Sequence, residues 1–387
     1  MNNIEQFEKE FAAFAQAKHG FAFWKARVAE YAIMKAMGVG PGDEVIMPGY
    51  TCVMDVNPVM YLGAKPVYID IEPVTYNIDA SKIEEAITPN TKIIVAQHTY
   101  SYPCEMDEIM AIANKHNIPV LEDCCLAIGS TYKGKACGTF GVASYWSFQW
   151  NKPFTTGVGG MATTNDPELA KKIEHIMKTE MVKPKLKPCI MLALQRMVYR
   201  TVIYPRTTAL VASVFRWLVK KRIISGSSSA GEYTPVMEDG YFCGMGSAQA
   251  KAGVAQLKKV KSNIAHRKNA CKQYEALLRE SGWDIPKIPD YLDTACVRFP
   301  LRVTNKQKAV DLAPGSGVEI GTWFECPLHP IETPMHLYGY KNGMCPEAEK
   351  ACREVINLPT HPRASASTLQ RTVSFVNRLK ENNDTSN

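Results

Sequence analysis

The feature that most constrains the fold is an alternation, between residues 40 and 160, of short apolar runs with segments of helical spacing. The runs are bounded by Pro, Gly and Asp and have the length of buried strands. They are DEVIMP, AKPVYID, TKIIVAQH, IPVLED, VASYWSF and GMATTN, and the helical segments include 79–87 and 105–117. This alternation predicts an α/β domain with a mostly parallel sheet and right-handed crossovers.

Ligands of such sheets bind at the carboxyl ends of the strands, so the residues after each run are the first candidates for a site. One run ends in Glu122 and Asp123, and another ends at Ser147 and leads to Lys152 in the uncharged stretch SYWSFQWNKPFTTGVGG. A lysine of low pKa reacts with carbonyls, and an aspartate beside a pyridine nitrogen keeps that nitrogen protonated. The pair suits pyridoxal 5′-phosphate (PLP). Two other interpretations stay open here: Asp123 as a helix cap or turn residue, and Lys152 as a surface lysine.

The composition is that of a soluble protein of about two domains, with 387 residues, 46% hydrophobic and 21% charged. The first residues, MNNIEQFEKEFAAF, carry acids and a helical apolar spacing. No signal peptide is therefore expected, and we predict a cytoplasmic protein. The 12 cysteines include no CxxC pair, and Cys124 and Cys125 are adjacent. We expect free thiols and no metal site.

Several motifs in order resemble the DegT/StrS family of PLP-dependent sugar aminotransferases. The resemblance extends from GVGPGDEVIMPGYTCVMDV through NIPVLEDCCLAIGS and SYWSFQWNKPFTTGVGG, and continues at AGVAQLKKV, WFECPLHP and VINLPTHP. It covers most of the chain. It implies PLP as the cofactor, a fold type I transferase with a large α/β domain and a small α+β C-terminal domain, and a homodimer with shared active sites.

The resemblance also implies roles for individual residues. Lys152 matches the lysine to which the cofactor is attached and which moves protons, Asp123 matches the partner of the pyridine nitrogen, and Ser147 matches a phosphate ligand. His98 and His329 match family histidines on the substrate side; for both, a structural histidine is an equal alternative. Gly159 and Gly160 are expected to serve the backbone of the turn and the following strand.

The expected phosphate site departs from the family pattern. Where the family has Ser-Gly-Thr at the start of the first large-domain helix, this chain has Lys25, Ala26 and Arg27. The helix N-terminus, with Ala26, and the Arg27 guanidinium are expected to hold the phosphate instead. A solvated cation at the helix start is the alternative for Arg27. The asparagine that reaches the phosphate across the dimer interface is replaced by Phe242.

The expected ring site departs as well. The aromatic residue that stacks on the cofactor falls at Cys52, with Tyr50 and Tyr100 as substitutes, and Tyr100 is also expected on the substrate side. The polar residue three positions after the family aspartate is Leu126. The chain is therefore expected to be a divergent member.

Residues 183–222 hold all of the positive excess. This insertion contains ten basic residues and no acidic one, whereas the rest of the chain has 35 basic and 38 acidic residues. It reads as two apolar helices around Pro205, and its longest uncharged run, Thr207 to Phe215, is nine residues, too short to cross a bilayer. Contact with an anionic membrane surface is the favoured interpretation. A hairpin packed on the enzyme or its dimer partner is the alternative, and no nucleic acid is expected.

The predicted boundaries follow from these segments. Residues 1–257 form the large domain, with the insertion at 183–222 and a linker at 223–232; residues 258–380 form the small domain, and 381–387 a tail. A strand is expected at CVRFPLRV, a helix at PEAEKACREVI, and a last helix, capped by Ser, at SASTLQRTVSFVNRLKENN.

The expected reaction is transamination, from an amino acid such as glutamate to the keto group of a sugar or related carbonyl acceptor. The basic insertion suggests a membrane-surface setting, in cell-envelope glycan or glycolipid synthesis. Two alternatives remain. One is a PLP-dependent dehydratase or other lyase, which the retained Lys152 disfavours. The other is a non-catalytic binding or regulatory protein. The departures at Cys52, Leu126, Phe242 and Lys25-Ala26-Arg27 favour it, and the pair of Asp123 and Lys152 opposes it.

Overall fold

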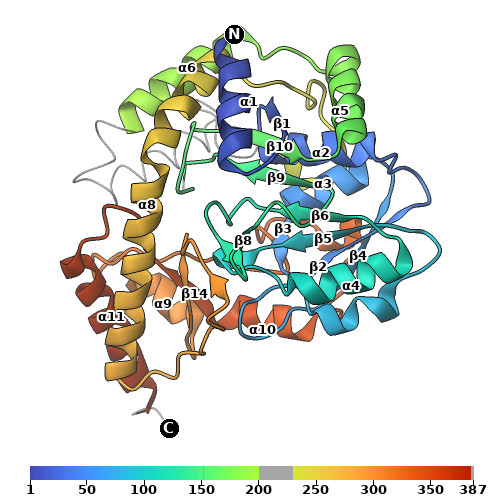
Figure 1. The fold of residues 1–387 in the computed structure, drawn as a ribbon. Helices are drawn as coiled ribbons and strands as arrows, with labels where there is room; N and C mark the ends of the chain where they lie inside the picture. The colour runs from blue at the N-terminus through green and yellow to red at the C-terminus, as the bar shows by residue number, and fades with distance from the viewer. Residues whose placement is uncertain (151, 200–229, 385–387) are drawn as a thin grey trace.

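A mixed sheet of seven strands forms the centre of the molecule (Figure 1). The structure, a computed structural model, describes residues 1–150, 152–199 and 230–384. The strand order is β1-β10-β9-β6-β5-β2-β4; β9, β6, β5, β2 and β4 are parallel, whereas β10 is antiparallel to both of its neighbours. The bounds are β1 His19–Phe23, β2 Glu44–Pro48, β4 Lys65–Ile69, β5 Thr91–Gln97, β6 Val120–Asp123, β9 Ala143–Ser147 and β10 Gly160–Thr164. The prediction of a mostly parallel α/β sheet is confirmed.

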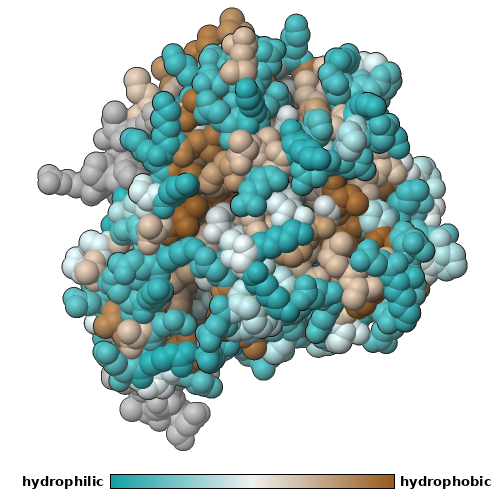
Figure 2. All heavy atoms as spheres, in the orientation of Figure 1, coloured by the Kyte–Doolittle hydropathy of each residue, from teal (hydrophilic) through white to brown (hydrophobic). Residues whose placement is uncertain are grey.

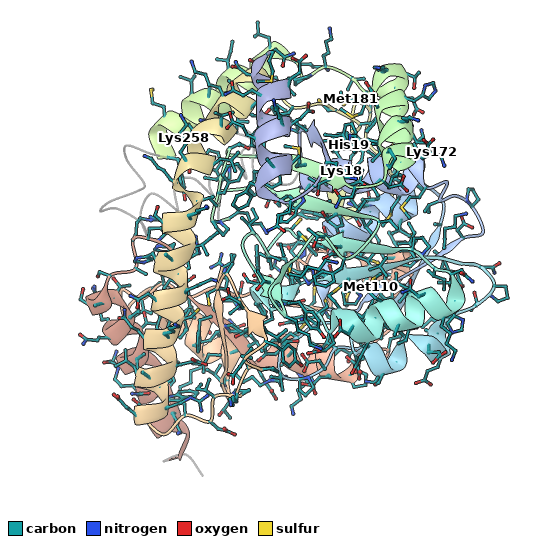
Figure 3. All side chains as sticks on the ribbon, viewed as in Figure 1. Lys18, His19, Met110, Lys172, Met181 and Lys258 are labelled. Atoms are coloured by element: carbon teal, nitrogen blue, oxygen red, sulfur yellow. The ribbon has the colours of Figure 1, made fainter. Side chains whose placement is uncertain are left out.

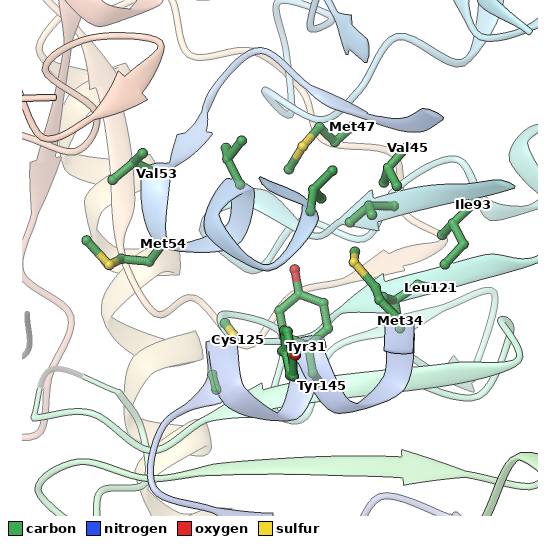
Figure 4. Packing of buried hydrophobic residues seen from close by; sticks show 14 of the residues in the cluster. Tyr31, Met34, Val45, Met47, Val53, Met54, Ile93, Leu121, Cys125 and Tyr145 are labelled. Atoms are coloured by element: carbon green, nitrogen blue, oxygen red, sulfur yellow. The ribbon is translucent and has the colours of Figure 1, made fainter. Parts of the chain in front are cut away.

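One face of the sheet is covered by α2 (Ala26–Ala36), α3 (Val53–Tyr61) and α5 (Pro167–Glu180). Because side chains alternate along a strand, Val45 and Met47 of β2 point toward these helices while Ile46 points to the other face. Figure 4 shows Tyr31 and Met34 of α2 beside Leu121 of β6. The start of α2 thereby comes to lie against the carboxyl ends of the central strands.

The opposite face is covered by α4 (Met106–His116), and by α1 (Asn3–Phe14) together with the first half of α8 (Ser247–Glu280). Phe7 and Phe11 of α1 pack edge-on against Phe148, just after β9. Helices on both faces bury the near-continuous apolar runs that the sequence shows. The turn after β9, which carries Lys152, therefore begins at an aromatic cluster that contains Phe7, Phe11 and Phe148.

The 34-residue helix α8 links the two parts of the chain, and it runs the length of the molecule in Figure 1. Val260 and Ile264 pack with the aromatic cluster around α1, whereas Ala270 and Tyr274 pack with the C-terminal residues. The boundary expected after residue 257 therefore lies inside α8. The helix changes from one core cluster to the other a few residues later, between Ile264 and Ala270. The C-terminal core lies between β12 (Phe299–Arg302), β14 (Val355–Leu358), α9 (Lys306–Leu312) and α11 (Ala366–Asp384).

Part of the C-terminal half returns to the large domain. β13 (Leu328–His329) pairs in parallel with β3 (Thr51–Cys52), which places His329 opposite Cys52. Phe324 belongs to the same core cluster as β2 and α2. So does Ala348, which lies in α10 (Pro346–Glu354). This return brings side chains of the C-terminal half over the carboxyl ends of the parallel strands.

Several local predictions have clear outcomes. The strand at CVRFPLRV, the helix at PEAEKACREVI and the last helix are present as β12, α10 and α11, and Ser365 Oγ accepts a hydrogen bond from Thr368 N at 3.3 Å. The helix expected over 79–87 is wrong: two 3-10 turns, Ala80–Lys82 and Glu84–Ala86, stand there. Only Ala80 and Ile83 are buried in this segment, so packing against the core stabilises little more than a single helical turn.

Of the insertion at 183–222, only the first part lies among the described residues. It forms α6 (Leu186–Val198), the first of the two predicted helices, beside the upper half of α8 in Figure 1. The second helix and most of the linker at 223–232 lie outside the described residues. The linker's last residue, Glu232, is buried within a 3-10 turn, Ala230–Tyr233. In the part of the chain that the structure describes, no helix has the length and apolar character needed to cross a membrane.

Candidate active site

Lys152 lies in the turn between β9 and β10, with its side chain directed inward. The residue is only 9% exposed, and its backbone N–H donates to Gln149 O at 3.0 Å. The Nζ atom lies 5.1 Å from the centroid of the Trp323 ring. Burial lowers the pKa of the Lys152 amine, although nearby thiols and the carboxylates of Asp123 and Asp55 oppose this shift. The interpretation as a surface lysine is therefore wrong.

Asp123 lies at the end of β6, in the middle of the sheet, and is 4% exposed. Its Oδ1 accepts a hydrogen bond from Cys125 N at 2.8 Å. Burial raises the pKa of Asp123, whereas this hydrogen bond and the Lys152 amine lower it. The structure thus brings Asp123 and Lys152 into one buried electrostatic cluster, as two neighbouring strand ends require.

Asp55 is a member of this cluster that the sequence analysis missed. It lies in the first turn of α3, where its Oδ2 accepts a hydrogen bond from Thr51 Oγ1 at 3.3 Å. Burial, followed by the charge of Asp123, raises the pKa of Asp55 to about 8. An acidic residue in the first turn of a helix has an ordinary structural explanation, so only its position after a short strand hinted at a site.

The N-cap residue of α2, Lys25, makes no side-chain hydrogen bond to the first turn of the helix among the described residues. The first helical residue, Ala26, lies against Gly160 so closely that a Cβ added at Gly160 would be 2.4 Å from Ala26 N. Gly160 pairs with Ser147 across β10 and β9, so Ser147 lies close to the same helix end. Uncapped N–H groups beside a hydroxyl are a ready site for phosphate. The expectation that Gly160 serves the backbone agrees with this close approach.

The two cations at this helix end share one carboxylate. Arg27 Nη1 lies 3.0 Å from Glu232 Oε1, and Lys25 Nζ lies 2.9 Å from Glu232 Oε2. The Glu232 main chain is held in turn, because Asn57 Nδ2 donates to its carbonyl at 2.7 Å. Arg27 is 2% exposed, so the alternative of a solvated cation is wrong. Burial, reinforced by the charge of Arg27, lowers the pKa of Lys25 to about 8.

His98 does not reach the substrate side. It is fully buried; its Nδ1 accepts from Cys104 N at 3.0 Å, and its Nε2 lies 3.2 Å from Glu122 Oε2. The Glu122 carboxylate also accepts backbone N–H groups of residues 138, 140 and 141. His98, Glu122 and Cys124 lie close enough to hold a metal ion, but the histidine and carboxylate groups already bind the backbone. The substrate contact predicted for His98 is therefore wrong, and its role is structural.

Tyr50 and Tyr100, the expected substitutes for the stacking aromatic residue, lie in the buried core. Tyr50 and Tyr100 are fully buried, with their hydroxyl groups 2.8 Å apart, and the Tyr100 hydroxyl also donates to the carbonyl of Trp323. Tyr100 thus holds Trp323 in place and has no exposed surface for a substrate, contrary to the prediction. His329 remains partly exposed, with its ring 6.4 Å from that of Trp323, and partly exposed Cys52 lies opposite it.

The two remaining departures are also buried. The Leu126 side chain is 7% exposed, and its carbonyl accepts a hydrogen bond from Ser101 Oγ at 2.7 Å. Phe242 packs against Phe23 and Tyr31 at ring distances of 6.0 and 5.6 Å. Neither residue offers a polar side chain to a ligand.

A cavity of about 570 Å³ opens beside Lys152, between the turn after β9, α8 and the C-terminal domain. We call it the Lys152 cavity. Its lining includes Lys152, Trp150, Arg298, Glu319, Thr360 and His361. The volume is in the range of sites for small organic ligands.

These residues fit PLP. Nζ of Lys152 makes no hydrogen bond or ion pair with any described residue, and the amine is buried with a lowered pKa, as a nucleophilic lysine requires. Asp123 provides a buried carboxylate for a pyridinium nitrogen. The uncapped α2 N-terminus and Ser147 provide a phosphate site. Glu232 competes with a phosphate at this place, because its carboxylate already pairs with Lys25 and Arg27.

Comparison with known proteins points to the same chemistry. The family model described as the DegT/DnrJ/EryC1/StrS aminotransferase family matches residues 1–192 and 221–377. A GDP-perosamine synthase of Caulobacter vibrioides is 31% identical over 97% of this chain and 90% of its own length.

Solved structures show the same fold. The aminotransferase from Psychrobacter cryohalolentis is 26% identical, with a TM-score of 0.76 over 98% of this chain and 91% of that chain. NtdA from Bacillus subtilis, solved with its cofactor PMP, is 25% identical, with a TM-score of 0.75 over 98% of this chain and 78% of that chain. The fold, family and cofactor predicted from the sequence are confirmed. The chain belongs to the DegT/DnrJ/EryC1/StrS aminotransferase family and is a PLP-dependent aminotransferase of fold type I.

Proposed function

We propose that this enzyme transfers the amino group of an amino acid, glutamate being the first donor to test, to the keto group of a sugar-like acceptor. The observation that carries the proposal is the buried Lys152 amine with its lowered pKa, in one cluster with Asp123. The acceptor class is supported by the sugar-synthesising relative from Caulobacter vibrioides. PLP bound here supplies an electron sink that makes the α-proton of the donor acidic.

The residues of this chain have distinct tasks in that reaction. Lys152 takes the proton from the donor Cα and returns it on the cofactor side, because a neutral amine of low pKa is both a competent base and, once protonated, an acid. Asp123 would keep the ring nitrogen of PLP protonated, since its carboxylate is buried in one cluster with the Lys152 amine. Ser147 and the α2 N-terminus would hold the phosphate of PLP.

An absorption spectrum of the purified protein with added PLP tests this proposal. Wild type is expected to develop the visible band of lysine-bound PLP, and L-glutamate is expected to bleach it. Lys152→Ala should show neither effect, whereas Lys258→Ala, on the exposed side of α8 (Figure 3), should behave as wild type. Bleaching with glutamate but release of ammonia in place of an aminated acceptor would identify a lyase. No band in wild type would overturn the proposal.

We further propose that the enzyme works as a cytoplasmic homodimer with shared active sites. The fold supports this, because dimerisation is typical of fold type I aminotransferases. Light scattering of the purified protein should give twice the 43.0 kDa of one chain. A monomer that retains full activity would contradict this part of the proposal.

We also propose that α6 lies on an anionic membrane surface. This helix exposes Leu186 by 75%, Ile190 by 49% and Leu194 by 48%, and Leu186 and Ile190 line an apolar groove with Met177 and Met181. The three exposed residues recur at helical spacing, and Lys183 and Lys185 precede them. Brown apolar atoms are visible at the top and upper left of Figure 2, where Figure 1 draws α6 and the upper end of α8. Apolar side chains flanked by lysines suit a bilayer interface with anionic headgroups.

Flotation with liposomes tests this placement. Wild type is expected to float with vesicles of phosphatidylglycerol and phosphatidylcholine, and much less with phosphatidylcholine alone. Changing Leu186, Ile190 and Leu194 to Ser should abolish flotation while leaving the PLP band intact. A matched triple change on the polar side of α11, at the exposed residues Gln370, Arg371 and Ser374, should leave flotation unchanged. If the α6 variant instead loses its dimer, this face is a subunit contact and the membrane proposal is wrong.

A further inference from the structure

The Lys152 cavity is lined by residues whose buried nitrogen atoms make no hydrogen bond with any described residue. Two of these atoms are obligate donors, Arg298 Nε and Trp150 Nε1, and both are shielded from solvent. A buried donor without a partner costs free energy, so these two beside one cavity indicate a missing group that accepts hydrogen bonds. His361 Nε2 is already engaged, 2.9 Å from Glu319 Oε2.

The charge around the cavity indicates that this missing group is an anion. Among the described lining residues the only acid is Glu319, which His361 already binds. The basic residues in the lining are Lys152, Arg196, Lys259, Arg267, Arg298 and Arg363. A cavity with such an excess of cations favours a negatively charged ligand.

The Trp323 ring lies close to both Arg298 and Lys152. Its centroid lies 5.1 Å from Lys152 Nζ and 5.1 Å from the Arg298 guanidinium carbon, so the two cationic groups are at most about 10 Å apart. The main chain of Trp323 is held by Asn357, which accepts from the backbone N–H at 3.2 Å and donates to the carbonyl at 3.1 Å. Arg298 therefore has a defined position relative to the Lys152 amine.

We propose that Arg298 binds the α-carboxylate of the amino-acid donor. This inference rests on the proposed function and names the donor subsite within it. The donor amine must come to the position of the Lys152 amine, and its carboxylate is attached to the same carbon as that amine. Lys152 Nζ and the Arg298 guanidinium are at most about 10 Å apart, which places Arg298 near the reacting centre, and a guanidinium binds a carboxylate with a pair of parallel hydrogen bonds.

The α-carboxylate of the donor is the ligand that we propose here, and a phosphate of a nucleotide-bearing acceptor is the alternative to be tested against it. Arg298 presents a planar fork, and Trp323 covers its face, which leaves the edge with Nε for a planar ligand. The same cavity serves donor and acceptor in turn. The test therefore has to separate the two halves of the reaction.

The test compares Arg298→Met and Arg298→Lys with wild type in the half-reaction with donor alone. Each variant is first loaded with PLP, and an unchanged band shows that the fold and cofactor site are intact. L-Glutamate is then compared with L-isoglutamine, which has an amide in place of the α-carboxylate. For Arg298→Met we expect the concentration of glutamate needed for half-maximal bleaching to rise about 10- to 100-fold, and the preference for glutamate over isoglutamine to disappear. Arg298→Lys should recover part of both.

A binding measurement gives a readout besides turnover. Glutarate, a carboxylate that cannot react, should bind the PLP-loaded wild type and lose most of its affinity in Arg298→Met. The affinity for ADP, a probe for acceptor phosphates, should be the same in both proteins. Arg279→Met, on the exposed end of α8, is the matched control. Normal glutamate and glutarate affinity in Arg298→Met would overturn the inference, and loss of ADP binding alone would assign Arg298 to the acceptor. If wild type itself does not react with any amino acid, the proposed function has failed, which is a separate result.

Discussion

Arg27 Nη1 lies 3.0 Å from a carboxylate oxygen of Glu232, a residue from the far side of the basic insertion. Both side chains are buried, and the pair lies at the uncapped N-terminus of α2, where the phosphate of PLP is expected. Glu232 thus neutralises cations that a phosphate would also bind. Loading of the cofactor and the conformation of the segment around Glu232 are expected to depend on each other.

Glu232→Gln tests this relationship. The substitution leaves buried Arg27, and Lys25 beside it, without their carboxylate, so we expect the cofactor-free protein to lose about 3 kcal/mol of unfolding free energy. Inorganic phosphate should restore much of this loss, because it supplies the missing negative charge. Thermal unfolding with and without 50 mM phosphate, roughly a saturating amount, measures both effects. Glu180→Gln, which removes the exposed partner of Lys35, should cost less than about 1 kcal/mol.

Gly160→Ala tests the close approach of α2 to the sheet. A Cβ at this position would lie 2.4 Å from Ala26 N and 2.4 Å from the carbonyl carbon of Lys25, both of them backbone atoms that cannot turn away. We expect a loss of about 1–3 kcal/mol in unfolding free energy and weaker PLP binding, because the helix end has to shift. Gly40→Ala is the control, since no atom of the described residues lies within 4 Å of its added Cβ. Equal stability of the two variants would contradict this account of Gly160.

Asp55 should make stability depend on pH. Burial, followed by the charge of Asp123, raises its pKa to about 8 from the ordinary value of 3.8. Between these two values the folded protein holds a proton that the unfolded chain has lost, so the free energy of unfolding falls as pH rises. Asp55→Asn removes this titration.

We expect the cofactor-free Asp55→Asn variant to match wild type near pH 4 and to gain at least about 1 kcal/mol over it at pH 8. Urea unfolding at several pH values measures the difference. Asp290→Asn, whose side chain is 90% exposed, should leave the profile of wild type unchanged. Parallel profiles for wild type and Asp55→Asn would show that Asp55 is charged throughout.

Trp323 should control how fast PLP attaches to Lys152. Burial is the main cause of the lowered Lys152 pKa, and the Trp323 ring covers the amine. Trp323→Ala exposes the amine to water and raises its pKa, so a smaller share is neutral at pH 7. We expect the PLP band to appear at least about 3-fold more slowly, with the pH midpoint shifted upward. Trp323→Phe should stay close to wild type, and an unchanged midpoint in Trp323→Ala would argue against this role.

The sequence by itself determined the type of fold and the two central residues of the site. The alternation of apolar runs and helical spacing reflects local periodicity and burial, which act over a few residues and can be read along the chain. Because strands of a parallel sheet end at one edge, Asp123 and Lys152 were predictable as neighbours. Their roles required the resemblance, since a strand-end aspartate alone has an ordinary structural explanation.

Only the tertiary structure decided which other side chains complete the site. Glu232 meets Arg27, and Trp323 and Arg298 meet Lys152, across large separations in the chain. No local pattern marks such pairs, because they depend on how β13 returns to β3 and on how the segment after the insertion is held by Asn57. The same packing made His98 a structural residue, since its ring nitrogens meet groups that the sequence does not place beside it. Periodicity is a local property, whereas the partners of a buried polar group are set by the whole fold.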